Sequence, residues 1–332
     1  MFPAEMHKEN LRLKKIAIVT SGGDAPGMNA AIRAITRVAS SNGLKVLGFE
    51  RGWQGLMSNN SRLLTPRSVG GILELGGSIL YTIRSPRFEE EKGMRKAAET
   101  LAANKVDGLV VIGGDGSFSG ARELAEKVDT LIVGVPASID NDVFGTDETI
   151  GFDTSVNTAV TEIDKIRDTA ISHERIFIIE VMGRTRGFLA LTAGITAGAE
   201  VILVPEIAVQ PEEVFHTLEQ NHAKGKKSGI IVAAEGIGDT RKLAEEITQK
   251  IGSEVRLTVL GYVQRGGSPT ARSRLLACLF GRRAVEALME KQGNRVVGLQ
   301  QGEITTISLE ESCRNKKPLD LELLQLAKTL AT

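Results

Sequence analysis

The sequence predicts an α/β protein whose largely parallel sheets are covered by helices. Short apolar runs rich in β-branched residues recur along the 332-residue chain and are continuous rather than alternating. Such runs are typical of strands buried on both faces. Stretches with helical spacing separate them, and strand alternating with helix is the pattern of parallel sheets. Glycine, with 36 residues, gathers directly after several of these runs.

The expected elements follow in order along the chain. Apolar residues between Met28 and Ala39, and again between Val156 and Ile166, recur at helical spacing and predict amphipathic helices. The apolar runs predict strands at residues 16–20, 44–49, 108–112, 131–135, 176–181, 201–204, 229–233, 256–260 and 296–299.

Composition excludes several classes of function. Lys+Arg and Asp+Glu both total 41, so no global field attracts nucleic acid or an acidic membrane. The two cysteines, Cys278 and Cys313, form no CxxC pattern, which argues against a disulfide framework or zinc site and fits a reducing cytoplasm. Residues 1–12 carry no signal-peptide pattern, and we expect a polar, poorly ordered tail there. No apolar run reaches membrane-spanning length.

Two glycine loops are candidate phosphate sites. Ligands of parallel sheets bind beyond the carboxyl ends of the strands. Gly-Gly-Asp occurs at 22–24 and at 113–115, each time between a predicted strand and a helix, where backbone N–H groups can approach phosphate. A single such loop is better explained as a tight turn, but two in register favour phosphate. Asp115 would repel phosphate unless a cation lay between them, so it is a candidate Mg²⁺ ligand.

A pair of carboxylates follows the fourth predicted strand. Asp140 and Asp142 stand two residues apart. In an extended segment they would point to the same side, about 7 Å apart at a rise of roughly 3.3 Å per residue. One could then accept a proton from a hydroxyl nucleophile and the other help to hold a metal, as phosphoryl transfer requires. An Asx-rich turn explains the motif equally well.

Several arginines lie beside glycine, proline or strand ends rather than on helix faces. Arginine forks match phosphate oxygens, and a kinase that acts on a sugar phosphate needs several of them. Any single one is better explained as a solvated surface charge, with Arg184 and Arg265 the hardest to dismiss. The set is Arg84, Arg175, Arg184, Arg256 and Arg265.

Taken together, these segments resemble the bacterial ATP-dependent 6-phosphofructokinase family over essentially the whole chain after residue 13. The matching stretches, in order, are TSGGDAPGMNAAIR at 20–33, VVIGGDGS at 110–117, SIDND at 138–142, GTD at 145–147, TIG at 149–151, RDT at 167–169, SHER at 172–175, EVMGR at 180–184 and VLGYVQRGGSP at 259–269. The resemblance implies phosphorylation of fructose 6-phosphate by ATP, the committed step of glycolysis, with Mg²⁺ as cofactor, in a cytoplasmic homotetramer.

The resemblance also assigns roles to residues. Asp140 resembles the general base, with Ser138 beside it, and Arg84 and Arg184 would stabilise the transferring phosphoryl group. Asp115 resembles the Mg²⁺ carboxylate, with Asp142 nearby. The positions that match the family's ATP site are Gly22, Arg84, Gly114, Asp115, Gly116 and Ser117. Those that match its sugar-phosphate site are Ser138, Asp140, Asp142, Arg175, Met182, Gly183, Arg184, Glu235, Arg256, Tyr262 and Arg265. In the family, Arg175 and Arg256 reach that site from a neighbouring subunit.

Some positions depart from the family pattern. Pyrophosphate-using relatives typically carry an Asp and a Lys where this chain has Gly116 and Ala137. Glycine leaves room for the α-phosphate of a nucleotide, which favours ATP, although typical ATP enzymes have glycine at 137. Tyr262 replaces a histidine, Glu89 an arginine and Ser273 an aspartate.

An effector site for ADP or phosphoenolpyruvate is a weaker expectation. The matching residues are Arg33, Arg37, Arg167, Glu200, Lys224 and Lys226, but Pro66 and Gly71 replace an arginine and an aspartate of the opposing loop. The resemblance further implies a larger ATP-binding domain, residues 13–151 plus 264–314, and a smaller sugar-phosphate-binding domain, residues 152–263 plus 315–332. The active site would lie in the cleft between them.

The alternatives belong to other classes. A pyrophosphate-dependent phosphofructokinase would use the same site with another donor. An NAD or lipid kinase shares the GGDG loop but lacks the other segments, and a dinucleotide-dependent dehydrogenase needs a GxGxxG loop, which we do not find. A non-catalytic subunit that binds nucleotide or sugar phosphate would require a damaged site.

Overall fold

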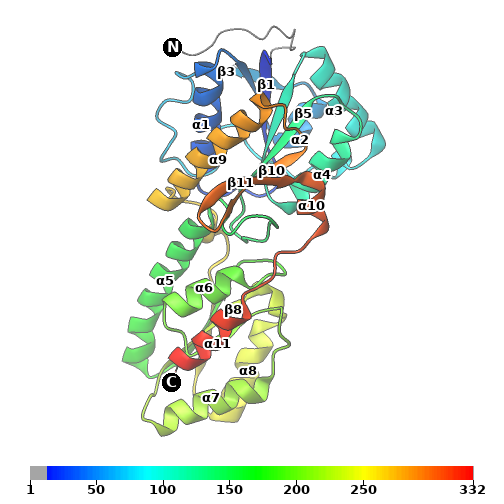
Figure 1. The fold of residues 1–332 in the computed structure, drawn as a ribbon. Coiled ribbons are helices and arrows are strands. Elements are labelled where there is room, and N and C mark those ends of the chain that lie inside the picture. The colour runs from blue at the N-terminus through cyan, green and yellow to red at the C-terminus, as the bar shows by residue number, and fades with distance from the viewer. Residues whose placement is uncertain (1–12, 332) are drawn as a thin grey trace.

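The structure is a computed structural model that describes residues 13–331. The expected polar tail at residues 1–12 lies outside the described residues. Two sheets lie one above the other, with helices on both faces of each (Figure 1). The predicted α/β class with mostly parallel strands is confirmed. In the described part of the chain, no helix is both long and apolar enough to span a membrane.

The larger sheet has seven strands, of which the central five run parallel. Most residues of these five strands are buried, as the continuous apolar runs predict, and β4 is buried throughout. The two outermost strands are antiparallel to their neighbours. Across the sheet the order is β11 (Glu303–Ser308), β10 (Arg295–Gln300), β5 (Leu131–Pro136), β4 (Gly108–Gly113), β1 (Lys15–Thr20), β2 (Lys45–Phe49) and β3 (Ser61–Leu64).

Helices cover both faces of this sheet and bury its apolar side chains. On one face α1 (Met28–Ser41) packs along α9 (Ala271–Met289). The approach is close, because a Cβ on Gly281 would lie 2.9 Å from the Cβ of Ala34. The other face is covered by α2 (Gly52–Met57), α3 (Glu91–Ala103), α4 (Asp115–Ala125) and α10 (Leu309–Arg314).

The smaller sheet has four parallel strands. Their order is β7 (Val201–Leu203), β8 (Gly229–Ala234), β6 (Ile176–Val181) and β9 (Val255–Val259). One face is covered by α5 (Phe152–His173), α6 (Phe188–Thr196) and α11 (Leu321–Leu330), and the other by α7 (Pro211–Ala223) and α8 (Thr240–Ile251). Short 3₁₀ turns occur at η1 (Pro86–Phe88), η2 (Glu235–Ile237) and η3 (Gly261–Gln264).

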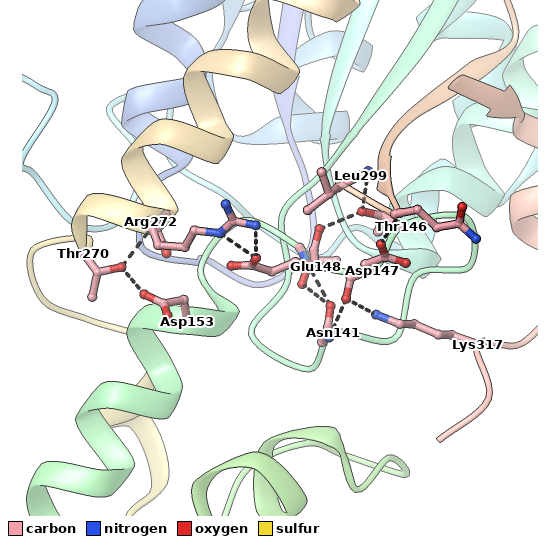
Figure 2. Close-up of polar contacts among 12 residues, drawn as sticks. Asn141, Thr146, Asp147, Glu148, Asp153, Thr270, Arg272, Leu299 and Lys317 are labelled. Atoms are coloured by element: carbon pink, nitrogen blue, oxygen red, sulfur yellow. Dashed lines mark hydrogen bonds and ion pairs between the residues drawn. The ribbon is translucent and has the colours of Figure 1, made fainter. Parts of the chain in front are cut away.

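The chain passes between the two sheets three times. It enters the smaller sheet through α5, returns through η3 to α9, and descends again from α10 to α11 (Figure 1). The start of α5 is tied to the start of α9, because the Thr270 hydroxyl donates to an Asp153 carboxylate oxygen at 2.5 Å and the Thr154 hydroxyl donates to Ser273 at 2.9 Å. Two of the crossings also contact the loop that follows β5, because Arg272 donates to Glu148 and Lys317 donates to the Asp147 carbonyl (Figure 2).

The strand predictions agree with the structure to within one or two residues at each end. Two strands were not predicted, β3 and β11. Both are antiparallel edge strands with several polar or partly exposed residues, so neither shows the continuous apolar run on which the prediction depended.

Candidate active site

A cavity of about 300 Å³ opens where the carboxyl ends of β1, β4 and β5 face the smaller sheet. The larger part contributes both glycine loops, the segment after β5 and Arg265, which precedes α9, and the smaller sheet contributes Arg184. The predicted residues that line it are Gly22, Arg84, Gly114, Asp115, Gly116, Ser117, Ser138, Asp140, Asp142, Arg184 and Arg265, together with the departures Glu89 and Ala137.

The first glycine loop has a backbone that favours glycine. Gly22 has φ +87°, and its carbonyl accepts a hydrogen bond of 2.8 Å from the Thr82 hydroxyl. At Gly23 a Cβ would lie 1.5 Å from the nearest Arg265 guanidinium nitrogen. The absence of a side chain therefore lets Arg265 lie against this loop, where its Nε is 3.7 Å from an Asp24 carboxylate oxygen.

The second glycine loop places the N-terminus of α4 at the cavity. Asp115 is the first residue of that helix, and Ser117 follows two positions later. Free N–H groups and the helix dipole favour an anion at this end. A Cβ on Gly116 would meet no atom within 4 Å, so this position leaves open space beside the helix end.

The segment after β5 is a turn, and the extended conformation considered for it is wrong. Asn141 adopts φ +53° because its side chain is anchored on both sides. Its amide oxygen accepts from the Thr149 N–H at 3.0 Å, and its amide nitrogen donates to the Asp147 carbonyl at 3.2 Å (Figure 2). The two carboxylates still face one cavity, and the Ser138 hydroxyl donates to an Asp142 carboxylate oxygen at 3.2 Å.

The carboxylates are held in a region where their charges are poorly compensated. Burial, followed by repulsion from Asp142, raises the pKa of Asp140 to about 6, against the opposing effect of Arg184. Burial and the charge of Asp142 also raise the pKa of Asp115. A carboxylate with a pKa near neutrality suits a general base.

Arg184 reaches the cavity from a strained turn after β6. Gly183 has φ +140° and Arg184 φ +55°. The turn is held by Glu235, whose carboxylate accepts from both backbone N–H groups, at 3.3 Å from Gly183 and 2.6 Å from Arg184. The Arg184 guanidinium Nε then lies 4.0 Å from an Asp140 carboxylate oxygen. Met182 is partly buried and packs against core residues of both sheets.

The cavity has an apolar wall that was not predicted from the sequence. Trp53 and Phe88 line it and stack with ring centroids 4.2 Å apart and planes at 2°. In the sequence, the single tryptophan stands beside no motif and is more readily explained as a packing residue. Trp53 is indeed buried, but it also forms part of the cavity surface.

Six predicted substrate residues do not line the cavity: Met182, Gly183 and Glu235, which form or hold the turn that presents Arg184, and Arg175, Arg256 and Tyr262. Arg175 and Arg256 both pair with Glu254 at the edge strand β9, with 2.6 Å between the Arg175 Nε and a Glu254 carboxylate oxygen. Tyr262 in η3 has 79% of its surface exposed. The Arg256 side chain is also exposed, whereas that of Arg175 is half-buried.

The predicted effector residues form one cluster and one separate pair. In the smaller part, Glu200 lies between Arg167 and Lys226, with its carboxylate Oε1 3.9 Å from each cation. Lys224 lies nearby on the cavity that Glu200 also lines. Arg33 and Arg37 belong to α1, over the larger sheet, and are apart from the other four (Figure 1).

The carboxylates of the cavity fit a divalent cation of the magnesium type. Among residues 13–331, no three His, Cys, Asp or Glu side chains gather as a protein-only metal cage. Asp115 and Asp142 nevertheless face the same space and repel each other. Mg²⁺ is typically bound by one or two carboxylates, with water and phosphate as its other ligands.

Comparisons with known proteins agree with this geometry. Residues 15–288 match the family model described as Phosphofructokinase. The chain is 50% identical over 319 residues to the ATP-dependent 6-phosphofructokinase of Brevibacillus brevis, which covers 96% of this chain and all of that one. It is likewise 50% identical over 321 residues to ATP-dependent 6-phosphofructokinase 1 of Thermus thermophilus, with 96% and 100% covered.

A solved structure has the same fold. The phosphofructokinase of Saccharomyces cerevisiae superposes with a TM-score of 0.84 at 35% identity, over 96% of this chain. The match spans 46% of the yeast chain, so this chain is about half the length of that relative.

Proposed function

This chain belongs to the phosphofructokinase family, and we propose that it transfers a phosphoryl group from ATP to the 1-hydroxyl of fructose 6-phosphate, giving fructose 1,6-bisphosphate and ADP. The observation that carries this proposal is the position of Asp140. Its carboxylate lies between the phosphate loops and Arg184, with its pKa raised to about 6.

In the proposed reaction, Asp140 accepts the proton of the sugar 1-hydroxyl as that oxygen forms a bond to the γ-phosphorus. The bond from the γ-phosphorus to the β–γ bridging oxygen breaks, and its electron pair leaves with ADP. Arg184, which follows β6 of the smaller sheet, stabilises the phosphoryl group during transfer, and Arg84, which also lines the cavity, does the same. Phosphoryl transfer depends mainly on such positioning and charge stabilisation.

The nucleotide is held by the larger sheet. Its phosphates lie along Gly22 and the N-terminus of α4, where Gly114, Gly116 and Ser117 supply close backbone approach. Asp115 and Asp142 hold Mg²⁺, which supplies charge neutralisation on the phosphates when bound. The open space at Gly116 supports ATP over pyrophosphate as donor, because an acidic side chain there would extend into the cavity.

The sugar phosphate is held by the opposite side. Met182, Gly183 and Glu235 belong to this side, and Ser138 and Arg265 join them from the larger domain. Arg175, Arg256 and Tyr262 lie outside the cavity, and in the proposed homotetramer the two arginines complete a neighbouring subunit's site. The separation of Arg33 and Arg37 from Arg167, Glu200, Lys224 and Lys226 is compatible with an effector site formed between subunits.

Two further expectations are retained as parts of this proposal. The division into domains at residues 13–151 plus 264–314 and 152–263 plus 315–332 is supported by the sheet to which each strand belongs. The separate, free Cys278 and Cys313 support a reducing compartment such as the cytoplasm.

A donor-exchange assay tests the function. Purified enzyme is given fructose 6-phosphate and Mg²⁺ with either ATP or pyrophosphate, and formation of fructose 1,6-bisphosphate is followed through a coupled aldolase reaction. We expect turnover with ATP and none above background with pyrophosphate. Turnover with pyrophosphate but not with ATP would identify pyrophosphate as the donor instead. Binding of fructose 6-phosphate without turnover on either donor would instead indicate a regulatory subunit.

A further inference from the structure

Lys317 lies on the segment that descends from α10 to α11, far in sequence from any motif of the active site. Its ammonium Nζ donates a 2.8 Å hydrogen bond to the carbonyl of Asp147 (Figure 2). The side chain is half-buried, and its Nζ lies 5.1 Å from the centroid of the Phe188 ring. Burial lowers the pKa of Lys317 to about 8, so the ammonium remains largely charged at pH 7.

The carbonyl that accepts from Lys317 also fixes the catalytic turn. Asp147 O accepts from the Asn141 amide at 3.2 Å, and Asn141 is the residue between Asp140 and Asp142. The loop that carries this carbonyl is itself pinned to β10, since Asp147 N donates to Leu299 O at 2.7 Å. Lys317 and Asn141 therefore share one acceptor on a fixed loop.

The backbone of Lys317 contacts the other half of the active site. Its carbonyl accepts a hydrogen bond from the Arg186 guanidinium, which lies 5.2 Å from the same Phe188 ring centroid. Arg186 N donates to Gly183 O at 2.9 Å and so closes the turn that presents Arg184. Residue 317 thus touches both the loop that holds Asp140 and the turn that holds Arg184.

These two contacts, from the Lys317 ammonium to the Asp147 carbonyl and from Arg186 to the Lys317 carbonyl, form a bridge between the two halves of the site. From this bridge we propose that Lys317 is a positioning residue, which sets the Asp140–Asp142 turn relative to Arg184 without touching substrate. The inference rests on the proposed phosphoryl-transfer function. A displacement of about 1 Å between reacting groups can cost a large factor in rate. Because Lys317 does not line the cavity, its loss should lower turnover rather than substrate affinity.

The test compares kcat and KM at pH 7 for the full chain and four variants. Lys317→Met keeps the aliphatic stem over Phe188 but removes the cation, and Lys317→Arg restores a donor. Arg186→Gln removes the second half of the bridge. Lys328→Met is the matched control, since it removes an ammonium from α11 that pairs only with Glu213 at 3.6 Å in the described contacts.

We expect Lys317→Met to lower kcat roughly tenfold, as loss of a charge-assisted hydrogen bond allows, with both KM values within about threefold of the wild type. Lys317→Arg should recover most of that loss, and Lys328→Met should match the wild type. Should Lys317→Met unfold, Arg186→Gln carries the test, with the same fall in kcat.

Three outcomes would overturn the inference. Unchanged kcat in folded Lys317→Met excludes positioning, and a rise in KM alone indicates substrate binding instead. A lower melting temperature with normal kcat per folded molecule indicates a purely structural residue. Inactivity of the wild type itself would refute the proposed function, which separates that failure from failure of this inference.

Discussion

Two charged regions of this molecule differ in how their charges are compensated. In the cleft, Asp115, Asp140 and Asp142 face a shared space, and burial together with mutual repulsion raises the pKa of the first two. Around Glu200, a single carboxylate lies between two cations and also accepts the Ile230 N–H at 2.7 Å.

The difference separates a region whose carboxylates have too few cations within the chain from one whose carboxylate has its own cations. Carboxylates that repel each other cost folding free energy, and such sites persist where chemistry or a cation requires them. A carboxylate with its own cations and a backbone donor contributes to stability instead. We therefore expect substitutions in the cleft to reduce activity more than stability, and the opposite around Glu200.

The largest effect is expected for the proposed base. Asp140→Asn keeps the shape of the side chain but cannot accept the substrate proton, so kcat should fall by roughly 10²-fold or more. The coupled assay with saturating fructose 6-phosphate and MgATP measures this. Asp164→Asn, an acid-to-amide change at an exposed position on α5, is the matched control and should keep wild-type turnover. A fall of less than about fivefold in Asp140→Asn would assign the base elsewhere.

A smaller effect is expected at the proposed metal carboxylate. Asp115→Asn removes one of two negative charges that face the phosphates, so the Mg²⁺ concentration that gives half-maximal rate should rise at least about tenfold. Loss of a residue that merely supports a metal ligand already lowers metal affinity by about that factor. Titration of Mg²⁺ at fixed ATP measures it. An unchanged Mg²⁺ requirement would remove Asp115 from the metal site.

The pH dependence should report the raised pKa of Asp140. A general base must be deprotonated, and its folded pKa lies at about 6 rather than 3.8. We therefore expect kcat/KM to fall as the pH drops through about 6, approaching a tenfold loss per pH unit below it. A profile that stays flat to pH 4.5 would contradict the assignment. Asp164→Asn should show the same fall in kcat/KM at low pH as the wild type.

The smallest effect is expected at the paired cluster. Glu200→Gln retains an acceptor for the Ile230 N–H but removes the charge that Arg167 and Lys226 share, so the free energy of unfolding should fall by about 1 kcal/mol. Urea unfolding at pH 8 measures it. No loss, or a gain, would show that this cluster is not self-neutralised as its geometry indicates.

Much of this arrangement was predictable from local sequence. Strands that are buried on both faces follow from continuous β-branched runs, and the glycine loops follow from their place after those runs. The edge strands β3 and β11 were missed because partly exposed antiparallel strands lack that signal.

The rest depends on contacts distant in sequence. The turn at Asn141 is fixed by Asp147 and Thr149, and that loop is held by Lys317, which lies 170 residues further along the chain. No spacing rule places these groups together. Likewise, nothing near Trp53 indicates that its partner Phe88 completes a cavity wall.

The most direct test of the contrast is the free energy of unfolding of Asp140→Asn at pH 8 and at pH 4. A raised folded pKa means that the stability linked to this group is present below pH 3.8 and is lost as the pH rises through about 6. We expect the variant to be more stable than the wild type at pH 8, by between about 1 and 3 kcal/mol, with little difference at pH 4. A variant that is less stable at pH 8 would contradict it.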